Sequence, residues 1–97
     1  MHIQKHHNQN KLTLVLEGRL DTSTAPMLEA ELGAVDGITE LTLDFAKLEY
    51  ISSAGLRVLL TTQKVMNKQG SMVIKNVNEV IMDIFQITGF ADILTIV

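Results

Sequence analysis

The sequence predicts a single α/β domain over residues 1–97, built on a mixed sheet of about five strands. Its 97 residues are enough for one hydrophobic core but not for two, and 46% of them are hydrophobic while 20% are charged. Stretches in which every second residue is apolar alternate with stretches of helical periodicity, in the order β-β-α-β-α-β-α-β. Because helices separate the later strands, those strands are expected to run parallel through crossover connections.

The chain is expected to begin with a hairpin. Residues 2–7 form a short edge strand in this interpretation, because the turn-forming residues 8–10 separate them from a stronger strand at 11–18. That second strand has leucine at every other position, which is the period of a strand with one buried face.

A helix follows the hairpin. Either Thr24 or Ser23 is the expected cap at its start, since both carry the hydroxyl that such positions favour. Gly33 and Gly37 are expected to end it. One face of this helix carries Ala25, Leu28, Leu32 and Val35.

The second half of the chain repeats the alternation of strand and helix. A core strand at 40–45 precedes a helix of roughly 55–69, and a short strand at 72–75 precedes an amphipathic helix over residues 77–89. A closing strand is expected at 94–97. No repeat, linker or low-complexity tract interrupts the series.

Composition excludes several classes of function. The net charge of −3 and pI near 5.5 provide no basic field for nucleic acid, and the absence of cysteine removes disulfides and thiolate chemistry. No apolar run reaches the ~20 residues of a membrane span, and the first residues have no signal-peptide core. We therefore expect a cytoplasmic protein that does not bind nucleic acid and does not insert into membranes.

Motifs for catalysis and cofactor binding are missing as well. The three histidines, His2, His6 and His7, lie in the expected edge strand without a cysteine or carboxylate pair to complete a metal site. There is no G-x-S-x-G, no P-loop and no G-x-G-x-x-G. The sequence thus predicts no catalytic residues, no metal and no cofactor.

Two polar turns each lead from a strand into a helix. One contains Asp21, and the other contains Ser52 and Ser53. If the two preceding strands are parallel neighbours, both turns emerge at the same edge of the sheet, where α/β proteins place their sites. The two turns would then share one surface.

The serine pair has one hydroxyl more than a helix cap requires. One serine oxygen can accept from a free N–H of the helix, while the other is left exposed beside Ala54 and Gly55. A phosphate there would be tolerated at the positive end of the helix dipole, but it would be unfavourable inside a partner's interface. The site therefore suits a binding switch, with simple capping as the alternative.

These residues resemble a known family. Two stretches are similar to the core signature of STAS domains, the anti-sigma factor antagonists of bacterial partner switching. They are Leu41-Thr42-Leu43-Asp44-Phe45 and Leu48-Glu49-Tyr50-Ile51-Ser52-Ser53-Ala54-Gly55-Leu56-Arg57. The stretches at 18–25, 70–74 and 84–90 also resemble the family, in the expected order. The resemblance implies helices packed mainly on one face of the sheet. Ser52 stands where the family often has aspartate, and Ala54 where it often has a second hydroxyl.

The resemblance also implies a function. Ser53 takes the position of the phosphoacceptor, which leaves Ser52 as the expected cap. A serine kinase that is itself the anti-sigma factor would add the phosphate, a serine phosphatase would remove it, and only the unphosphorylated antagonist would bind the kinase. The expected partner-binding residues are Asp21, Thr22, Ser23, Thr24, Ser52, Ser53, Ala54, Gly55, Leu56 and Arg57.

Two other interpretations remain open at this point. The domain could be a STAS-like structural subunit of a transporter or a lipid-trafficking ATPase, with the serines serving only as caps. It could also be a small phosphotransfer relay or hydrolase that uses Asp21, although a single carboxylate without a base or metal ligand is thin support.

Overall fold

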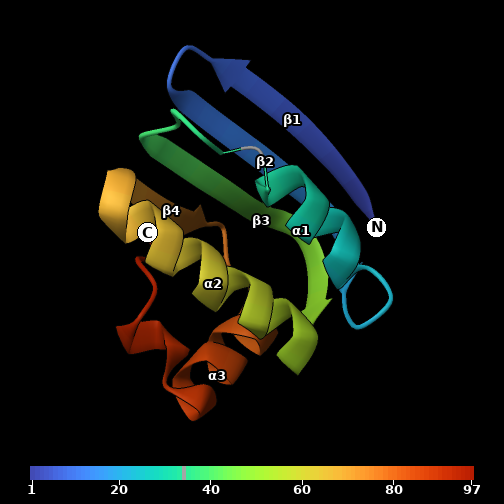
Figure 1. Cartoon of the computed structure of the whole chain (residues 1–97). Helices are drawn as coiled ribbons and strands as arrows, with labels where there is room; N and C mark the ends of the chain where they lie inside the picture. The colour runs from blue at the N-terminus through green and yellow to red at the C-terminus, as the bar shows by residue number, and fades with distance from the viewer. Residues whose placement is uncertain (34) are drawn as a thin grey trace.

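The part of the chain that the structure describes, residues 1–33 and 35–97 of a computed structural model, forms a four-stranded sheet with three α-helices and one short 3-10 helix (Figure 1). The strands are β1 (His2–Asn8), β2 (Lys11–Leu20), β3 (Glu40–Ile51) and β4 (Ser71–Lys75). The helices are α1 (Ala25–Leu32), α2 (Ser53–Gln69), α3 (Glu79–Thr88) and the 3-10 helix η1 (Phe90–Asp92). None of these helices is long and apolar enough to cross a membrane.

The sheet is mixed, as predicted. Its strand order is β1-β2-β3-β4, with β1 antiparallel to β2 and the other pairs parallel. Leu14 of β2 lies opposite Leu43 of β3, which in turn lies opposite Ile74 of β4, and all three side chains are fully buried. A slip of one residue would turn this apolar row to the other face of the sheet, so burial fixes the register.

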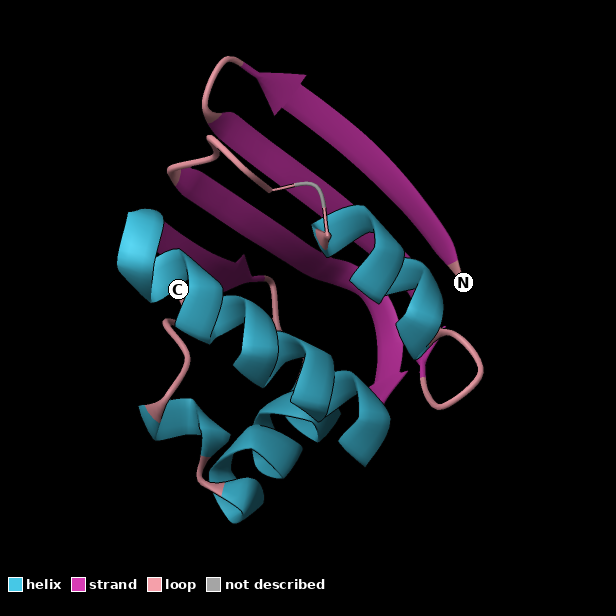
Figure 2. Cartoon of the chain, viewed as in Figure 1, coloured by secondary structure: helices cyan, strands magenta, loops and turns pink. Residues whose placement is uncertain are grey.

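The helices lie on one face of the sheet (Figure 2). Leu41 and Leu43 of β3 are buried, whereas Thr42 and Asp44, which alternate with them along the strand, are only partly covered. This alternation is typical of a strand with one face on the core and one face toward water. The arrangement is the one that the family resemblance implied.

The strand expected at residues 94–97 is wrong. A left-handed Gly89, with φ of 81°, ends α3, and η1 occupies the next residues. Leu94 is then buried in the core, and a single bridge between Ile96 and Ile74 joins the segment to β4. Residues 94–97 follow η1 but meet β4 only around Ile74, whose N–H donates to the carbonyl oxygen of Thr95 at 2.9 Å and whose carbonyl oxygen accepts from the N–H of Val97 at 3.0 Å.

Two other boundaries differ from the predicted ones. The first helix ends at Leu32, so that Val35, expected on its apolar face, is buried in the following loop instead. The strand predicted at 40–45 continues to Ile51, because its ladder with β2 continues as far as Leu20.

Gly70, which lies between α2 and β4, is expected to be important for stability. At this position the chain passes directly against the backbone of Thr39. A Cβ atom there would collide with the carbonyl oxygen of Thr39, which accepts a hydrogen bond of 2.9 Å from the N–H of Ser71. Gly70→Ala should therefore lower the free energy of unfolding by about 1–3 kcal/mol in urea denaturation.

Gly33→Ala is the matched control for this experiment. Gly33 has an ordinary φ of −69°, and the nearest atoms to an added Cβ lie at 3.5 Å. The control should stay within about 0.5 kcal/mol of the wild type. Equal stability of Gly70→Ala and wild type would contradict the close approach.

Candidate functional site

The candidate site lies at the edge where β2 and β3 both end. The two strands are parallel neighbours, and their last residues, Leu20 and Ile51, lie opposite each other. The N–H of Ser52 continues this pairing by donating to the carbonyl oxygen of Leu20 over 2.9 Å. The predicted parallel pairing is confirmed, and it brings the turn that begins at Asp21 beside the start of α2.

Two irregularities in this ladder shape the edge. The register between β2 and β3 shifts between Val15 and Glu17, and again between Gly18 and Arg19. Gly18 has a φ of 104°, a conformation that favours glycine. Bulges of this kind bend a strand and increase its twist, and the end of β3 that leads to α2 curves visibly in Figure 1.

The carboxylate of Asp21 is bound within its own turn. Its Oδ1 accepts hydrogen bonds from the backbone N–H of Ser23 at 3.0 Å, the Ser23 hydroxyl at 2.7 Å and the Thr24 N–H at 3.2 Å. The Ser23 hydroxyl in particular holds the pKa of Asp21 below its ordinary value, although desolvation opposes the effect. A carboxylate engaged in this way is a structural element of the turn, which argues against the hydrolase interpretation.

The start of α1 differs from the prediction that a Ser23 or Thr24 hydroxyl caps the helix. Thr24 occupies the N-cap position, but no side chain accepts from the first turn of the helix. The Thr24 hydroxyl instead donates to the carbonyl oxygen of Arg19 at 2.7 Å and accepts from the Asp21 N–H at 2.8 Å. The backbone carbonyl of Asp21 accepts from the N–H of Ala25 at 2.8 Å. The hydroxyls of Ser23 and Thr24 both bind groups of the turn, so the start of α1 is bound by the backbone carbonyl of Asp21 and not by a side-chain cap.

Arg19 and Tyr50 are site residues that the sequence reasoning missed. The shifted register places them opposite each other, with the guanidinium of Arg19 4.5 Å from the centre of the Tyr50 ring. The Nε atom of Arg19 also lies 3.9 Å from Oδ2 of Asp21. Their positions in the stretches that lead into the two polar turns were the available signal, but the register shift that pairs them was not visible.

The serine pair is divided differently from the prediction. Ser52 is the N-cap residue of α2 by position, and its carbonyl oxygen accepts from the N–H of Leu56 at 3.0 Å. Its hydroxyl, however, makes no capping hydrogen bond, and its Oγ is buried without a partner among the described residues. The predicted side-chain cap is wrong, because the backbone bond to Leu20 holds Ser52 as the end of the ladder with its hydroxyl inward.

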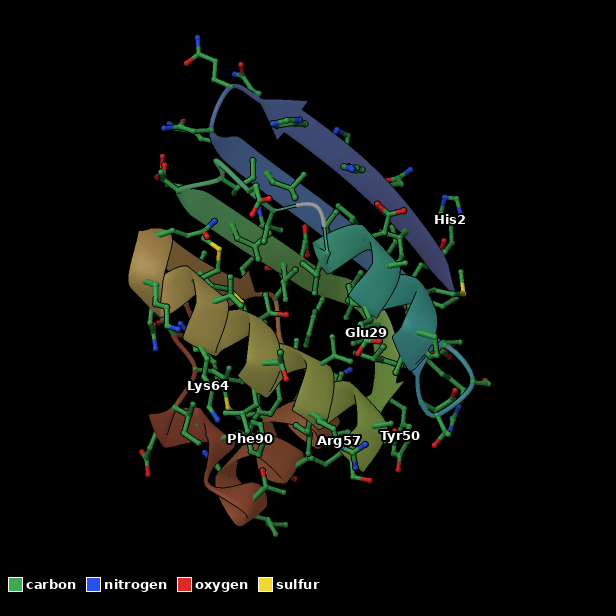
Figure 3. All side chains as sticks on the ribbon, viewed as in Figure 1. His2, Glu29, Tyr50, Arg57, Lys64 and Phe90 are labelled. Carbon is green, nitrogen blue, oxygen red and sulfur yellow. The ribbon has the colours of Figure 1, made fainter. Side chains whose placement is uncertain are left out.

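Ser53 is exposed as the first residue of α2. The first N–H groups of a helix have no partner within it, so the Ser53 hydroxyl stands beside free donors and at the positive end of the helix dipole. Arg57, one turn further along α2, is also exposed and forms no ion pair with the described residues. Figure 3 shows Arg57 and Tyr50 at the same end of the molecule.

Gly55 and Leu56 lie beneath the surface that the other site residues form. A Cβ atom on Gly55 would come within 2.7 Å of Cγ of Leu20 and 2.8 Å of Cγ1 of Ile51, so the first turn of α2 rests directly on both strand ends. Leu56 is 6% exposed. Of the other residues expected to bind a partner, those fully exposed are Thr22, Ser23, Ser53 and Arg57, and those half-buried are Asp21, Thr24, Ser52 and Ala54.

Within residues 1–33 and 35–97, no three His, Cys, Asp or Glu side chains come together as metal ligands. The histidines lie on the exposed β1, at the opposite edge of the sheet from β4. The arrangement at the end of β2 and β3 provides neither a general base nor an activated nucleophile. What it does provide is an accessible hydroxyl at a helix N-terminus.

Comparison with known proteins identifies the fold and its family. The family profile described as "Mlab, STAS domain" matches residues 3–96. The chain therefore belongs to the STAS domain family.

Within that family, the chain belongs to the anti-sigma factor antagonists, which are regulators and not enzymes. It is 40% identical over 88 residues to BtrV of Bordetella bronchiseptica, a candidate anti-sigma factor antagonist, covering 88% of this chain and 76% of that protein. It is also 32% identical over 91 residues to the anti-sigma-B factor antagonist of Bacillus subtilis, covering 92% and 84% of the two chains.

A solved structure agrees in fold. The anti-sigma factor antagonist SpoIIAA in its unphosphorylated form matches 99% of this chain and 87% of its own, with a TM-score of 0.79 at 17% identity. The phosphorylated form of SpoIIAA of Bacillus matches with a TM-score of 0.77.

The Asp21 turn leads to a prediction about pH. Because the folded-state pKa of Asp21 lies below its ordinary value of 3.8, the carboxylate stabilises the fold above that pH, and this contribution is lost as pH falls through the folded pKa. Ser23→Ala removes the hydroxyl that lowers this pKa most. The Asp21 pKa should then rise toward 3.8 in a carboxyl NMR titration.

Asp44 is the internal control for the titration. Its pKa is also lowered, chiefly by a hydrogen bond from Asn76, which Ser23→Ala does not touch. An Asp21 pKa that is the same in both proteins, or an Asp44 pKa that moves with it, would contradict the assignment.

Proposed function

We propose that this protein captures an anti-sigma factor with serine kinase activity while Ser53 is unphosphorylated, and that phosphorylation of Ser53 releases it. The observation that carries the proposal is the exposed Ser53 at the start of α2, held beside the Asp21 turn by the bond between Ser52 and Leu20. The curated relatives are named as antagonists of anti-sigma factors, which supports the choice of partner.

The chemistry of the site fits a reversible charge switch. A phosphate brings about −1.5 to −2 charges at neutral pH, and the free N–H donors and dipole of α2 can stabilise it in place. The exposed guanidinium of Arg57 adds positive charge on the same helix. The domain can therefore carry the modification without refolding, and the effect falls on the partner's interface.

Release follows from the loss of solvation. A phosphate pressed into a partner's surface loses its water, and a penalty of ~3 kcal/mol weakens binding about a hundredfold. The proposed contact surface comprises the exposed and half-buried residues of the two turns, and Gly55 and Leu56 support it from below.

Two further expectations belong to the same proposal. A serine phosphatase restores the binding form, because phosphoserine is otherwise stable. The exchange of partners takes place in the cytoplasm, where a sigma factor and its antagonist meet.

Phosphorylation by the cognate anti-sigma factor kinase tests the proposal. With ATP, the intact mass should increase by one phosphate in the wild type and should not increase in Ser53→Ala. Ser52→Ala is the matched control and should still gain one phosphate, because the Ser52 hydroxyl is buried.

Affinity for the kinase provides the second measurement. Ser53→Asp places a negative charge at the acceptor position and should weaken binding by about a hundredfold in calorimetry, while Ser53→Ala binds as the wild type. A phosphate that persists in Ser53→Ala, or full affinity in Ser53→Asp, would overturn the switch. Recovery of the protein with a membrane ATPase, unaffected by Ser53→Asp, would favour the structural-subunit interpretation.

A further inference from the structure

The outer side of α3 carries apolar side chains that are exposed or only partly covered by the core. Val80 is 56% exposed and Ile87 is 85% exposed, while Ile84 between them is half-buried. Positions 80, 84 and 87 have the i, i+4, i+7 spacing that places side chains in one row along a helix. We refer to Val80, Ile84 and Ile87 as the α3 stripe.

Packing of α3 against the domain accounts for the partial burial of Ile84 but not for the exposure of Val80 and Ile87. The inward side of the helix is formed by Ile81 and Phe85, both fully buried, and the ring of Phe85 lies 6.5 Å from that of Phe45 in β3. The helix already has its apolar face in the core. Ile87 and Val80 lie in one row on the helix, so their apolar surface is contiguous along α3 and not scattered singly.

Acidic residues accompany the stripe. Glu79 and Asp83 are exposed, stand one turn apart, and form no ion pair with the described residues. Over residues 76–97 the sequence has three acidic residues, Glu79, Asp83 and Asp92, and no lysine, arginine or histidine. The stripe therefore runs beside carboxylates in a segment without a compensating positive charge.

We propose that the α3 stripe is a docking site for an amphipathic helical segment of a partner protein whose apolar row is flanked by lysine or arginine. Apolar side chains would bury Val80 and Ile87, and the basic flank would meet Glu79 and Asp83. Charge complementarity selects this occupant. An anionic lipid surface would be repelled by the same carboxylates, and a second copy of the chain would place acid beside acid.

The contacts that hold α3 involve none of the residues of the Ser53 site. The Asn78 side chain caps the helix by accepting from the N–H of Ile81 at 2.8 Å, and its amide donates to the carbonyl oxygen of Leu48 at 3.0 Å. These bonds and the packing of Phe85 hold α3 against β3 at Leu48 and Phe45, which precede Ser53 in the chain. Docking on the stripe should therefore be the same in the phosphorylated and unphosphorylated protein.

Titration with a synthetic peptide tests the proposal. The probe is a fluorescein-labelled amphipathic helix with a row of leucines flanked by lysines, and a twin peptide carries glutamate in place of lysine. Fluorescence anisotropy should show saturable binding of the lysine peptide and at least about tenfold weaker binding of the glutamate peptide. Amide shifts in a ¹⁵N NMR titration should concentrate on Val80, Asp83 and Ile87.

Variants separate the two components of the interaction. Ile87→Ser should weaken binding of the lysine peptide about tenfold or more, whereas Met27→Ser, which alters an exposed methionine on α1, should leave it unchanged. Asp83→Asn should weaken binding less and reduce its dependence on salt. Ile87 and Asp83 are exposed, so neither change should affect folding.

Several outcomes would overturn the proposal. They are the absence of saturable binding, shifts that map away from α3, full affinity in Ile87→Ser, and sedimentation with phosphatidylglycerol vesicles. A dimer in analytical ultracentrifugation that Ile87→Ser dissociates would assign the stripe to a second copy instead. Because the peptide and the kinase assays use different surfaces, the failure of one leaves the other intact.

Discussion

The candidate site depends on the parallel pairing of β2 with β3 through to their last residues. Ser52 is held to Leu20 by a backbone hydrogen bond, and the first turn of α2 rests on Leu20 and Ile51 at a distance that only glycine permits at position 55. Since α2 cannot rise from this support, Ser53 is fixed at the surface beside the Asp21 turn. A larger residue at position 55 would move the whole start of the helix.

The polar groups around this joint are largely occupied with each other. Asp21 binds the amides and hydroxyls of its own turn, and Arg19 lies against Tyr50 and Asp21. A catalytic site needs a group that is free to exchange a proton with a substrate, and here the acidic group is committed to structure. Among residues 1–33 and 35–97, no base hydrogen-bonds to the exposed hydroxyl of Ser53, so this hydroxyl is suited to receive chemistry performed by another protein.

Much of the fold could be predicted because burial repeats along the sequence. The alternating leucines of β2 and β3 predicted the strands, and their parallel pairing, assumed from the strand and helix order, brings the two turns to one edge. The role of Ser53 as phosphoacceptor is implied by the family resemblance and stays a prediction. Properties that depend on tertiary contacts could not be predicted. The segment at 94–97 is as apolar in sequence as β4, but in the structure it joins the sheet through a single bridge, between Ile96 and Ile74. The register shifts that join Arg19 to Tyr50, the inward hydroxyl of Ser52 and the close approach at Gly55 each depend on neighbours distant in the sequence.

In the two proposals, β3 supports two surfaces that differ in how they respond to modification. Its last residue is followed by Ser52 and Ser53, whereas Leu48, earlier in the strand, anchors α3 through Asn78. A phosphate on Ser53 would act through its local charge, whose field is screened over about 8–10 Å at physiological salt. The anchor of α3 is a hydrogen bond to a backbone carbonyl together with a buried aromatic ring, and neither changes with that charge. The two proposals together give one small domain a surface that switches and another that stays constant, so that a partner bound to α3 would remain attached while the proposed kinase partner is released.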